Sequence, residues 1–252
     1  MISSGDNPKI KLTRALLSQN KARARHNLAA LEGTRLIQDV LHQGYKPEFV
    51  LYRGETPPEW LSEVLALGVA PKIFDALADT DNSQGVLGVF PQPQPPTAPH
   101  GSLWLALDGL RDPGNMGTIL RTAAAAGADG ALLLPGCVDP WNPKAVRAGM
   151  GAHFRVPLWL LGWDDFAAAF AGDWAVWVAD AAAPKAQPYS QANLTRATVL
   201  MIGSEAHGVS HQARQQATGA LMIPMARGVE SLNSASAAAV LLFEAQRQRA
   251  LG

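Results

Sequence analysis

Short apolar runs alternate with segments of helical spacing along most of the chain. In residues 101–252 the strand-like runs are SLWLAL, GALLLP, WAVWVAD, TVLMIG and ALMIP. The segments between them, which have helical composition and spacing, are TILRTAAAAG, NPKAVRAG, WDDFAAAF, SHQARQQA and SLNSASAAAVLLFEAQRQR. Continuous apolar strands separated by helices predict an α/β domain with a mainly parallel sheet that is covered on both faces.

Residues 1–96 alternate in a similar way. GTRLIQDVLHQG predicts a helix that ends at Gly44, EFVLYR predicts a strand, and PPEWLSEVLALG predicts a helix with prolines at its start. PKIFDALADT reads as a further strand–helix step, and QGVLGVF as a closing apolar strand. This pattern predicts a small α/β domain.

A proline-rich segment, PQPQPPTAPH at residues 91–100, separates the two patterns. Prolines this dense cannot continue a helix or a central strand, and they favour a semi-rigid extended spacer. We therefore predict a first domain over residues 1–96, a linker that ends near residue 100, and a second domain over residues 101–252.

The composition is that of a globular protein, with 48% hydrophobic and 17% charged residues in 252. Cys137 is the single cysteine, which excludes an internal disulfide framework and a multi-cysteine zinc site. His153 and His207 have no acid or cysteine at ligand spacing, so we expect no metal. No apolar run approaches the roughly 20 residues that span a bilayer, and no hydrophobic leader follows the first charges. We expect a cytoplasmic protein without a membrane partner.

The formal net charge is zero, but the charges are unevenly distributed. Between Asp6 and Glu32 there are six cations and no acid, namely Lys9, Lys11, Arg14, Lys21, Arg23 and Arg25. A basic arm of this kind can neutralise several backbone phosphates of a nucleic acid. A solvated helix face explains the same charges equally well.

The segment LDGLRDPGNMGTILRTAAAAGADG, residues 107–130, runs from a strand through a Pro-Gly turn into an alanine-rich helix. The turn supplies only G-x-x-G rather than the G-x-G-x-x-G of dinucleotide-binding folds, and no Gly-Lys-Ser/Thr follows, which excludes a Walker loop. Asp139 follows the next strand at a tolerable position for a ribose-binding acid. A dinucleotide-dependent oxidoreductase therefore stays an alternative.

Asn115 and Arg121 are the notable polar residues of this helix. The sequence pattern opens the helix on Asn115, and a purely structural reading makes this residue an N-cap, whose side-chain oxygen accepts an orphan N–H. Arg121 follows six residues later, within an otherwise small and apolar run. It should project near the carboxyl edge of the sheet, where its guanidinium can bind a phosphate through a fork of donors.

Two later strand ends carry polar residues toward the same edge. MIGSEAHGVS places Glu205 among glycines, and IPMARGVESLNSASAAAVLLFE leads into a long helix that we expect to begin at Ser231-Leu232-Asn233. Taken singly, Glu205 fits a solvated loop acid and Ser231 fits a helix cap. Ligands of open α/β sheets bind at the carboxyl ends of the strands, so three such loops together predict a site.

Three ordered motifs resemble those of the SpoU (TrmH-like) family of RNA ribose 2′-O-methyltransferases, within the SPOUT superfamily. They are Asn115-x-Gly117-x-x-x-Arg121, then Ile202-Gly203-Ser204-Glu205 with Gly208, then Ile223-Pro224-Met225 with Ser231-Leu232-Asn233. The motifs cover roughly residues 105–245 in the family's order. Through EGTRLIQDVL and QGVLGVF, the first part resembles the family's L30e-like substrate-binding domain.

The resemblance implies a trefoil-knotted SPOUT domain and a homodimer that packs partly through the last helix. It also implies the cofactor S-adenosyl-L-methionine, held largely by backbone groups of Gly203, Ile223 and Leu232. The helix at the expected dimer contact is rich in alanine and serine, which would allow close approach of two backbones.

The resemblance further implies methyl transfer to a ribose 2′-hydroxyl of RNA, with Arg121 as the catalytic residue. An arginine is a costly free base because its pKa exceeds about 12. We therefore expect Arg121 to bind the phosphate beside the target ribose, and the 2′-proton to leave through that phosphate or late through Arg121. The residues expected to orient the arginine and the ribose are Asn115, Glu205, Ser231 and Asn233.

Two positions depart from the family pattern. Ala206 stands where glycine is common, and Ser234-Ala235-Ser236 replaces Val-Ser-Val, which displaces the hydroxyl by one position.

Members with this accessory domain favour 23S ribosomal RNA as the substrate, with transfer RNA as the alternative. A catalytically silent RNA-binding protein is the third reading, and the presence of the motif residues disfavours it.

Overall fold

The computed structural model describes residues 1–78, 83–229 and 231–251, and the chain forms two compact units. The first unit consists of residues 1–93 together with 139–154, and the second of residues 94–138 together with 155–252. The sequence division at the proline-rich linker assigned residues 139–154 to the second part, whereas the structure groups them with the first. The chain therefore returns once to its N-terminal unit.

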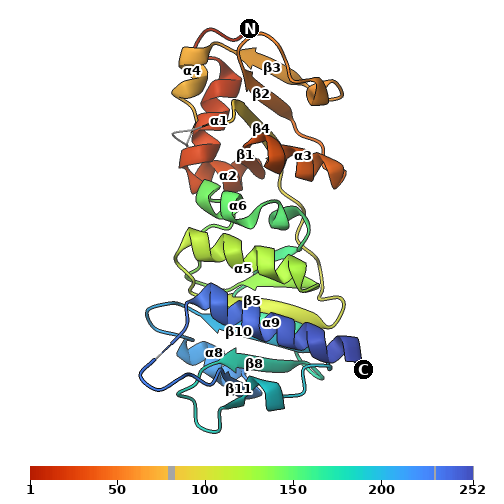
Figure 1. Ribbon diagram of the computed structural model, residues 1–252, viewed down its shortest axis with the longest axis vertical. Coiled ribbons are helices and arrows are strands. Elements are labelled where there is room, and N and C mark those ends of the chain that lie inside the picture. Colours follow the sequence, from red (N-terminus) through yellow and green to blue (C-terminus); the bar gives the residue numbers. More distant parts are fainter. Residues whose placement is uncertain (79–82, 230, 252) are drawn as a thin grey trace. The chain divides into compact units, whose positions relative to one another are not determined.

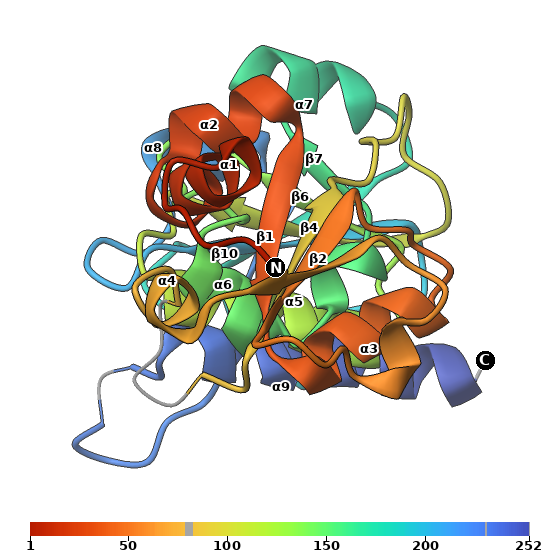
Figure 2. The ribbon, with the colours of Figure 1, turned by 90° about the horizontal axis from the view of Figure 1, so that it is seen from above.

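The first unit is built on a mixed sheet with the strand order β1-β4-β2-β3. Strand β4 is antiparallel to β1 and to β2, and β2 is parallel to β3. Helices α1 and α2 lie on one face of the sheet and α3 on the other (Figure 2). Its elements are α1 (Pro8–Ser18), α2 (Asn20–His26), β1 (Leu28–Glu32), α3 (Thr34–His42), β2 (Phe49–Arg53), the 3-10 turn η1 (Glu59–Leu61), β3 (Ala66–Val69), α4 (Pro71–Asp75), β4 (Val86–Pro91), α6 (Pro143–Gly149) and the 3-10 turn η2 (Ala152–Phe154).

Two predictions for this unit need correction or restriction. The helix predicted for PPEWLSEVLALG is wrong, because the segment forms only η1 and then the strand β3. Residues 66–69 pair with β2 in parallel register, and this pairing outweighs the helical preference of leucine and alanine. Part of the step predicted for PKIFDALADT falls on residues 79 and 80, which lie outside the described residues.

The cations of the basic arm lie on α1 and α2, and half of them are engaged within the unit. Lys11 forms an ion pair with Asp6, and Lys9 lies 4.4 Å above the ring of Phe49. The hydrogen bond and charge of Lys11 lower the pKa of the Asp6 carboxyl. The members left exposed are Arg14, Lys21 and Arg25.

Arg23 is the buried member of the basic arm. Its Nε donates to Asp139 Oδ2 at 2.7 Å, and its Nη1 donates to the Leu16 carbonyl at 2.6 Å. Because Asp139 begins the return segment, this ion pair fixes that segment to the first unit. The charge of Arg23 is therefore structural, and Asp139, the acid that the oxidoreductase reading would use for a ribose, is its partner.

The return segment also supplies an aromatic cluster to the first unit. Helix α6 packs against β1, and the Phe154 ring makes edge contacts with Tyr45 and Phe90. His153 is buried, and its Nε2 lies 2.8 Å from the Pro140 carbonyl oxygen, so this nitrogen carries the proton. Burial lowers the pKa of His153 to about 4.

The second unit contains seven parallel strands in the order β7-β6-β5-β10-β8-β11-β9 (Figure 1). The prediction of an α/β fold with a mainly parallel sheet is confirmed. The trefoil knot stays a prediction. The elements are β5 (Leu103–Asp108), α5 (Pro113–Ala125), β6 (Gly130–Leu133), β7 (Leu158–Leu160), α7 (Trp163–Ala169), β8 (Ala175–Ala179), β9 (Gln187–Pro188), the 3-10 turn η3 (Tyr189–Gln191), β10 (Thr198–Gly203), α8 (His211–Gln216), β11 (Gly219–Met222) and α9 (Ser234–Leu251).

The packing of this sheet determines where its loops meet. Trp104 is fully buried in β5, and its ring contacts those of Trp159 and Phe170. Helices α5 and α9 pack against each other. Strands β5 and β10 are parallel neighbours in register, so that Asp108 and Gly203, their last residues, lie side by side. The loops that follow these two strands therefore emerge together at the carboxyl edge.

Within the described ranges, no helix combines the length and the apolarity that crossing a bilayer requires.

Candidate active site

The loop after β5 delivers Asn115 to the carboxyl edge of the sheet. Helix α5 begins at Pro113, and the Asp112 carboxylate accepts the Asn115 backbone N–H at 2.7 Å. The structural reading of Asn115 as the helix cap is therefore wrong, because Asp112 is the cap. Proline fits the first helical position because its fixed φ suits a helix and its missing N–H needs no partner. With the cap supplied by Asp112, the Asn115 carboxamide is free to make other contacts.

The loop after β10 folds back tightly on the end of its strand. Ser204 and Gly208 exchange two backbone hydrogen bonds of 2.9 Å each, which places Glu205 in the loop between them. A Cβ atom at Gly203 would lie 2.1 Å from the Gly208 carbonyl carbon, and Gly208 has a φ of +64°. Both glycines are thus required by the close approach and by the left-handed turn. Asp108 secures the following residues, because its Oδ2 accepts the Ser210 N–H at 2.5 Å.

The loop after β11 ends at Asn233, immediately before α9. Asn233 Oδ1 accepts the backbone N–H of Ala235 at 2.8 Å, which is the contact of a helix cap. Of the expected start at Ser231-Leu232-Asn233, only Asn233 belongs to the helix start, since it is the cap and the helix runs from Ser234. Ser231 instead lies in the preceding loop and lines the cavity described below.

A continuous series of hydrogen bonds joins the three loops. Asn233 Nδ2 donates to Asn115 Oδ1 at 3.1 Å, and Asn115 Nδ2 donates to Glu205 Oε1 at 2.7 Å. The Ser234 hydroxyl donates to the same Glu205 oxygen at 3.2 Å. We call these four residues the loop network. Oε1 is thus held by two donors, while Oε2 makes no hydrogen bond to the described residues and is available to a ligand.

Sequence reasoning missed Ser234 as a member of this network. The sequence did show that the hydroxyl near the start of the last helix is displaced relative to the family pattern. The structure shows what the displaced hydroxyl does, since Ser234 is buried and contacts Glu205. A hydroxyl one residue after Asn233 was the available signal.

Beside the loop network is a cavity of about 250 Å³ at the carboxyl ends of β8, β10 and β11. All three residues expected to hold the cofactor, Gly203, Ile223 and Leu232, line this cavity. Glu205 and Ser231 also line it, which brings the second and third motif loops together. The apolar contribution comes from side chains of Leu221, Met225 and Leu232.

Asp180 is a cavity residue that the sequence reading did not single out. It follows β8, and its Oδ2 accepts a hydrogen bond from Arg214 Nε at 2.7 Å. Its Oδ1 accepts the Ala182 N–H at 3.1 Å. An acid at a strand end was the only signal available, and the structure shows that this acid is already paired.

Arg121 lies outside the cavity lining. It is exposed on α5, two turns after the start of the helix, and makes no hydrogen bond or ion pair with another residue in the described ranges. Thr118 and Thr122 on the same helix donate to backbone carbonyls of α5. The structure thus brings seven of the eight expected site residues together and leaves the Arg121 guanidinium free for an external partner.

The described residues contain no group of three His, Cys, Asp or Glu side chains that could hold a metal ion. Cys137 donates to the Leu107 carbonyl at 3.2 Å, and burial raises the pKa of its thiol. A raised pKa disfavours the thiolate, so Cys137 is not activated as a nucleophile.

Comparison with known proteins places both parts of the chain. The sequence model of the SpoU rRNA Methylase family matches residues 102–243, which is more than half of the chain, and that of the MRM3-like substrate binding domain matches residues 7–88. The chain is 34% identical over 302 aligned positions to the mitochondrial rRNA methyltransferase 3A of Danio rerio, covering 97% of this chain and 69% of that protein.

Two further relatives match over nearly their whole length. The 23S rRNA (guanosine(2553)-2′-O)-methyltransferase RlmP of Bacillus subtilis is 29% identical, with 96% of this chain and 97% of that protein covered. The AdoMet-bound structure of an rRNA methyltransferase from Sinorhizobium meliloti is 33% identical and superimposes with a TM-score of 0.86, covering 98% of this chain and 97% of that one.

Proposed function

Because this chain belongs to the SpoU rRNA methylase family, we propose that it transfers a methyl group from S-adenosylmethionine to a ribose 2′-hydroxyl of ribosomal RNA. The observation that carries this proposal is the loop network, which joins the residues of all three family motifs beside one cavity. The described part of the chain offers no metal cluster and no activated thiol as a competing chemistry.

The cavity fits the cofactor by its chemistry. Strand ends leave backbone N–H and C=O groups without ladder partners, and Gly203 and Ile223 present such backbone at the cavity wall. Leu221, Met225 and Leu232 provide apolar contacts of the kind that an adenine ring needs. When bound, S-adenosylmethionine supplies a methyl carbon already activated by its sulfonium sulfur.

The protein's task is then to position the ribose and accept its proton. The free Oε2 of Glu205 accepts a hydrogen bond from a ribose hydroxyl, while Oε1 is held by Asn115 and Ser234. Arg121 binds the phosphate next to the target ribose through its planar fork of donors. Transfer of the methyl group would break its bond to the sulfonium sulfur and leave a neutral thioether, and the ribose 2′-proton would pass to that phosphate, or late in the reaction through Arg121.

We take 23S ribosomal RNA as the substrate and transfer RNA as the alternative. Three exposed cations of the first unit, Arg14, Lys21 and Arg25, support binding to an RNA backbone. The relatives named as ribosomal RNA methyltransferases support the choice of ribosomal RNA.

The cytoplasmic location expected from the sequence stays a prediction, because the relatives include mitochondrial proteins.

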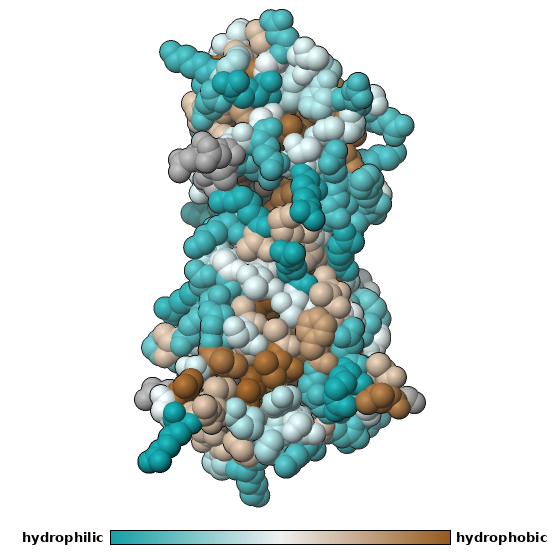
Figure 3. Space-filling model, in the orientation of Figure 1, coloured by the Kyte–Doolittle hydropathy of each residue, from teal (hydrophilic) through white to brown (hydrophobic). Residues whose placement is uncertain are grey.

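We further propose that the protein is a homodimer that packs through α9. Apolar side chains gather on the face along which α9 runs (Figure 3). On this helix Phe243 is 45% exposed, and Leu232 just before the helix is 39% exposed. Large apolar side chains exposed together mark an association surface more often than a free one.

Labelled methyl transfer tests the enzymatic proposal. The purified protein, labelled S-adenosylmethionine and bulk ribosomal or transfer RNA should yield labelled RNA whose modification resists alkaline cleavage, as 2′-O-methyl does. Calorimetry with S-adenosylmethionine and with NAD serves as the control for the oxidoreductase alternative. Tight NAD binding without a response to the methyl donor would overturn the proposal, and cofactor binding without methyl transfer to any RNA would favour a silent RNA-binding protein.

A further inference from the structure

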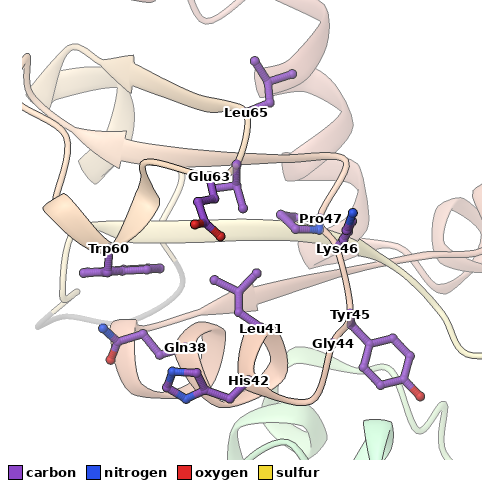
Figure 4. A pocket seen from close by; sticks show the side chains of 11 residues that line it. Gln38, Leu41, His42, Gly44, Tyr45, Lys46, Pro47, Trp60, Glu63 and Leu65 are labelled. Atoms are coloured by element: carbon purple, nitrogen blue, oxygen red, sulfur yellow. The ribbon is translucent and has the colours of Figure 1, made fainter.

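The first unit contains a cavity of about 470 Å³ that is separate from the loop network (Figure 4). It lies between the end of α3, the segment that leads into β2, and the η1–β3 segment. Its volume is within the roughly 300–1,000 Å³ range typical of small-molecule sites. The site is therefore large enough for a nucleobase together with its sugar.

The walls of this cavity are held by the fold. Helix α3 ends at His42, and Gly44 then turns the chain with a φ of +87°, while its N–H donates to the Leu41 carbonyl at 2.9 Å. Tyr45 follows, and its ring packs edge-on against Phe154 at 4.9 Å between centroids. On the other side, the buried Leu61 fixes η1 and so positions the neighbouring Trp60. Both sides are thus formed before a ligand binds.

The polar groups of the cavity have no partner within the described residues. They are Gln38, His42, Lys46 and Glu63. Figure 4 shows the Glu63 carboxylate directed into the space between the Trp60 ring and the Leu41 side chain. The same view shows the Trp60 ring edge-on, with one face turned toward Gln38 and His42. An indole face and a carboxylate therefore border the same space.

The charges of the cavity argue against a phosphate as its main ligand. Lys46 and Glu63 carry opposite charges, and the C-terminal end of α3 adds a partial negative charge. Leu41, Pro47 and Val64 add apolar surface. A flat, uncharged ring with hydrogen-bond donors on its edge fits this combination. Unpaired RNA bases are recognised in this way, by stacking on an aromatic ring and by hydrogen bonds to the exposed edge.

We propose that this cavity binds one unpaired guanine of the RNA substrate, stacked on Trp60, with Glu63 accepting hydrogen bonds from the Watson–Crick edge. Guanine is the base whose edge presents two neighbouring donors, the N1–H and the 2-amino group, to a carboxylate. Gln38 and Lys46 line the same cavity and can donate hydrogen bonds to acceptor groups of the nucleotide. The inference rests on the proposed function, because it takes RNA as the substrate.

Fluorescence anisotropy with short labelled oligonucleotides tests the proposal on the full-length protein. The probes are an oligouridylate with one central guanosine and the all-uridine oligomer of equal length. We expect about tenfold tighter binding of the guanosine probe to the unchanged protein. Glu63→Gln should abolish that preference, and Trp60→Ala should weaken binding of the guanosine probe about 5- to 100-fold. Glu59→Gln, in the same η1 segment but outside the cavity lining, is the matched control and should leave both affinities unchanged.

Two outcomes would overturn the inference: equal affinity of the unchanged protein for both probes, or an undiminished guanosine preference in Glu63→Gln. The thermal unfolding midpoint of each variant, measured by circular dichroism, serves as the check on folding. Methyl transfer to ribosomal RNA is measured in parallel to separate this inference from the proposed function. A guanosine preference that depends on Glu63, in a protein without methyl transfer, would support the base site and reject the enzyme.

Discussion

The Asn115 carboxamide is the central residue of the loop network. Its oxygen accepts from Asn233 and its nitrogen donates to Glu205, so its orientation is fixed from both sides. A side chain fixed in this way holds Glu205 Oε1 in place without using Oε2. The arrangement prepares one carboxylate oxygen for a ribose hydroxyl before the RNA arrives.

Arg121 is expected to act on the RNA rather than on the cofactor, because it is exposed and lies outside the cavity. Arg121→Ala should lower kcat about 100-fold or more, with the Kd for S-adenosylmethionine unchanged. Arg121→Lys keeps the charge but loses the planar fork, and we expect about a tenfold loss. Single-turnover methyl transfer and calorimetry measure the two quantities. Near-normal turnover by the lysine variant would contradict the need for a planar fork.

Glu205 should act through its two hydrogen-bond donors as well as through its free oxygen. Glu205→Gln retains an acceptor for Asn115 and Ser234, so we expect kcat/KM to fall about tenfold or less. Glu205→Ala leaves both donors without an acceptor and should lower kcat/KM about 100-fold. The matched control is Asp173→Ala, an exposed acid elsewhere in the second unit. Equal activity of the alanine variant and the unchanged protein would remove Glu205 from the site.

At this scale the sequence predicts most of the site, but neither the cap of α5 nor the hydrogen bond of Ser234. Asn115, Glu205 and Asn233 could be predicted because the spacing of their motifs can be read from the sequence alone. Asp112 could not, because several residues near each helix start have a side chain that can cap it. Which one does so depends on where the chain enters the helix, as Pro113 shows for α5.

At the scale of elements, the turn after β10 is the most constrained feature of the site. Gly203→Ala would place a Cβ 2.1 Å from the Gly208 carbonyl carbon, and backbone cannot give way as a flexible side chain can. We expect the turn to open, Glu205 to move away from Asn115, and methyl transfer to fall about 100-fold or more. The free energy of unfolding should fall by about 1–3 kcal/mol. Denaturant titration and methyl-transfer assays measure both.

The control for this prediction is Gly162→Ala, at a glycine of the same unit with φ of −74°, where the added Cβ would lie 3.6 Å from Asp165 Oδ2. Its unfolding free energy reports the effect of an added methyl group where there is no close approach of backbone. If Gly203→Ala lowered the free energy of unfolding and the rate of methyl transfer no more than this variant does, the close approach of Gly203 and Gly208 would not be needed for function.

The strand predictions succeeded where apolar runs are long and failed at the sheet edges. Residues 198–203 form β10 as predicted, since the run is buried throughout its length. The edge strands β7 and β9 of the second unit and β1 and β3 of the first were not predicted, because their conformation is set by pairing with a neighbour. Pairing partners far away in sequence are not visible in a local pattern.

At the scale of the whole molecule, His153 makes stability depend on pH. Its pKa is about 4 in the fold against 6.5 for an unperturbed histidine, with burial as the main cause. Above pH 6.5 both folded and unfolded states hold it neutral. As the pH falls toward 4, only the unfolded chain binds the proton, so the free energy of unfolding falls by about 2 kcal/mol at pH 5.

His153→Gln removes this contribution while retaining a donor for the Pro140 carbonyl. The difference in unfolding free energy between the variant and the unchanged protein should therefore narrow or reverse between pH 7 and pH 5. Urea titration at the two pH values measures it. Parallel pH dependence of the two proteins would show that His153 is not the group responsible.

The proposed dimer is tested on α9. Phe243→Glu replaces an exposed apolar ring with a charge, which should convert the dimer into a monomer at micromolar concentration because burial of an unpaired charge is costly. Size-exclusion chromatography with light scattering measures the mass. Phe243→Leu is the conservative control and should remain dimeric. A monomeric unchanged protein would contradict the proposal.

The ion pair between Arg23 and Asp139 has a consequence for how the protein is made. A nascent chain emerges from the ribosome in order, N-terminus first. When the first 93 residues have emerged, the guanidinium destined for burial still lacks its counterion, and the aromatic ring that will cover Phe90 has yet to be synthesised. The N-terminal unit is thus completed only after synthesis has passed residue 154, and a truncated gene that stops at the proline-rich stretch would encode an unfinished product.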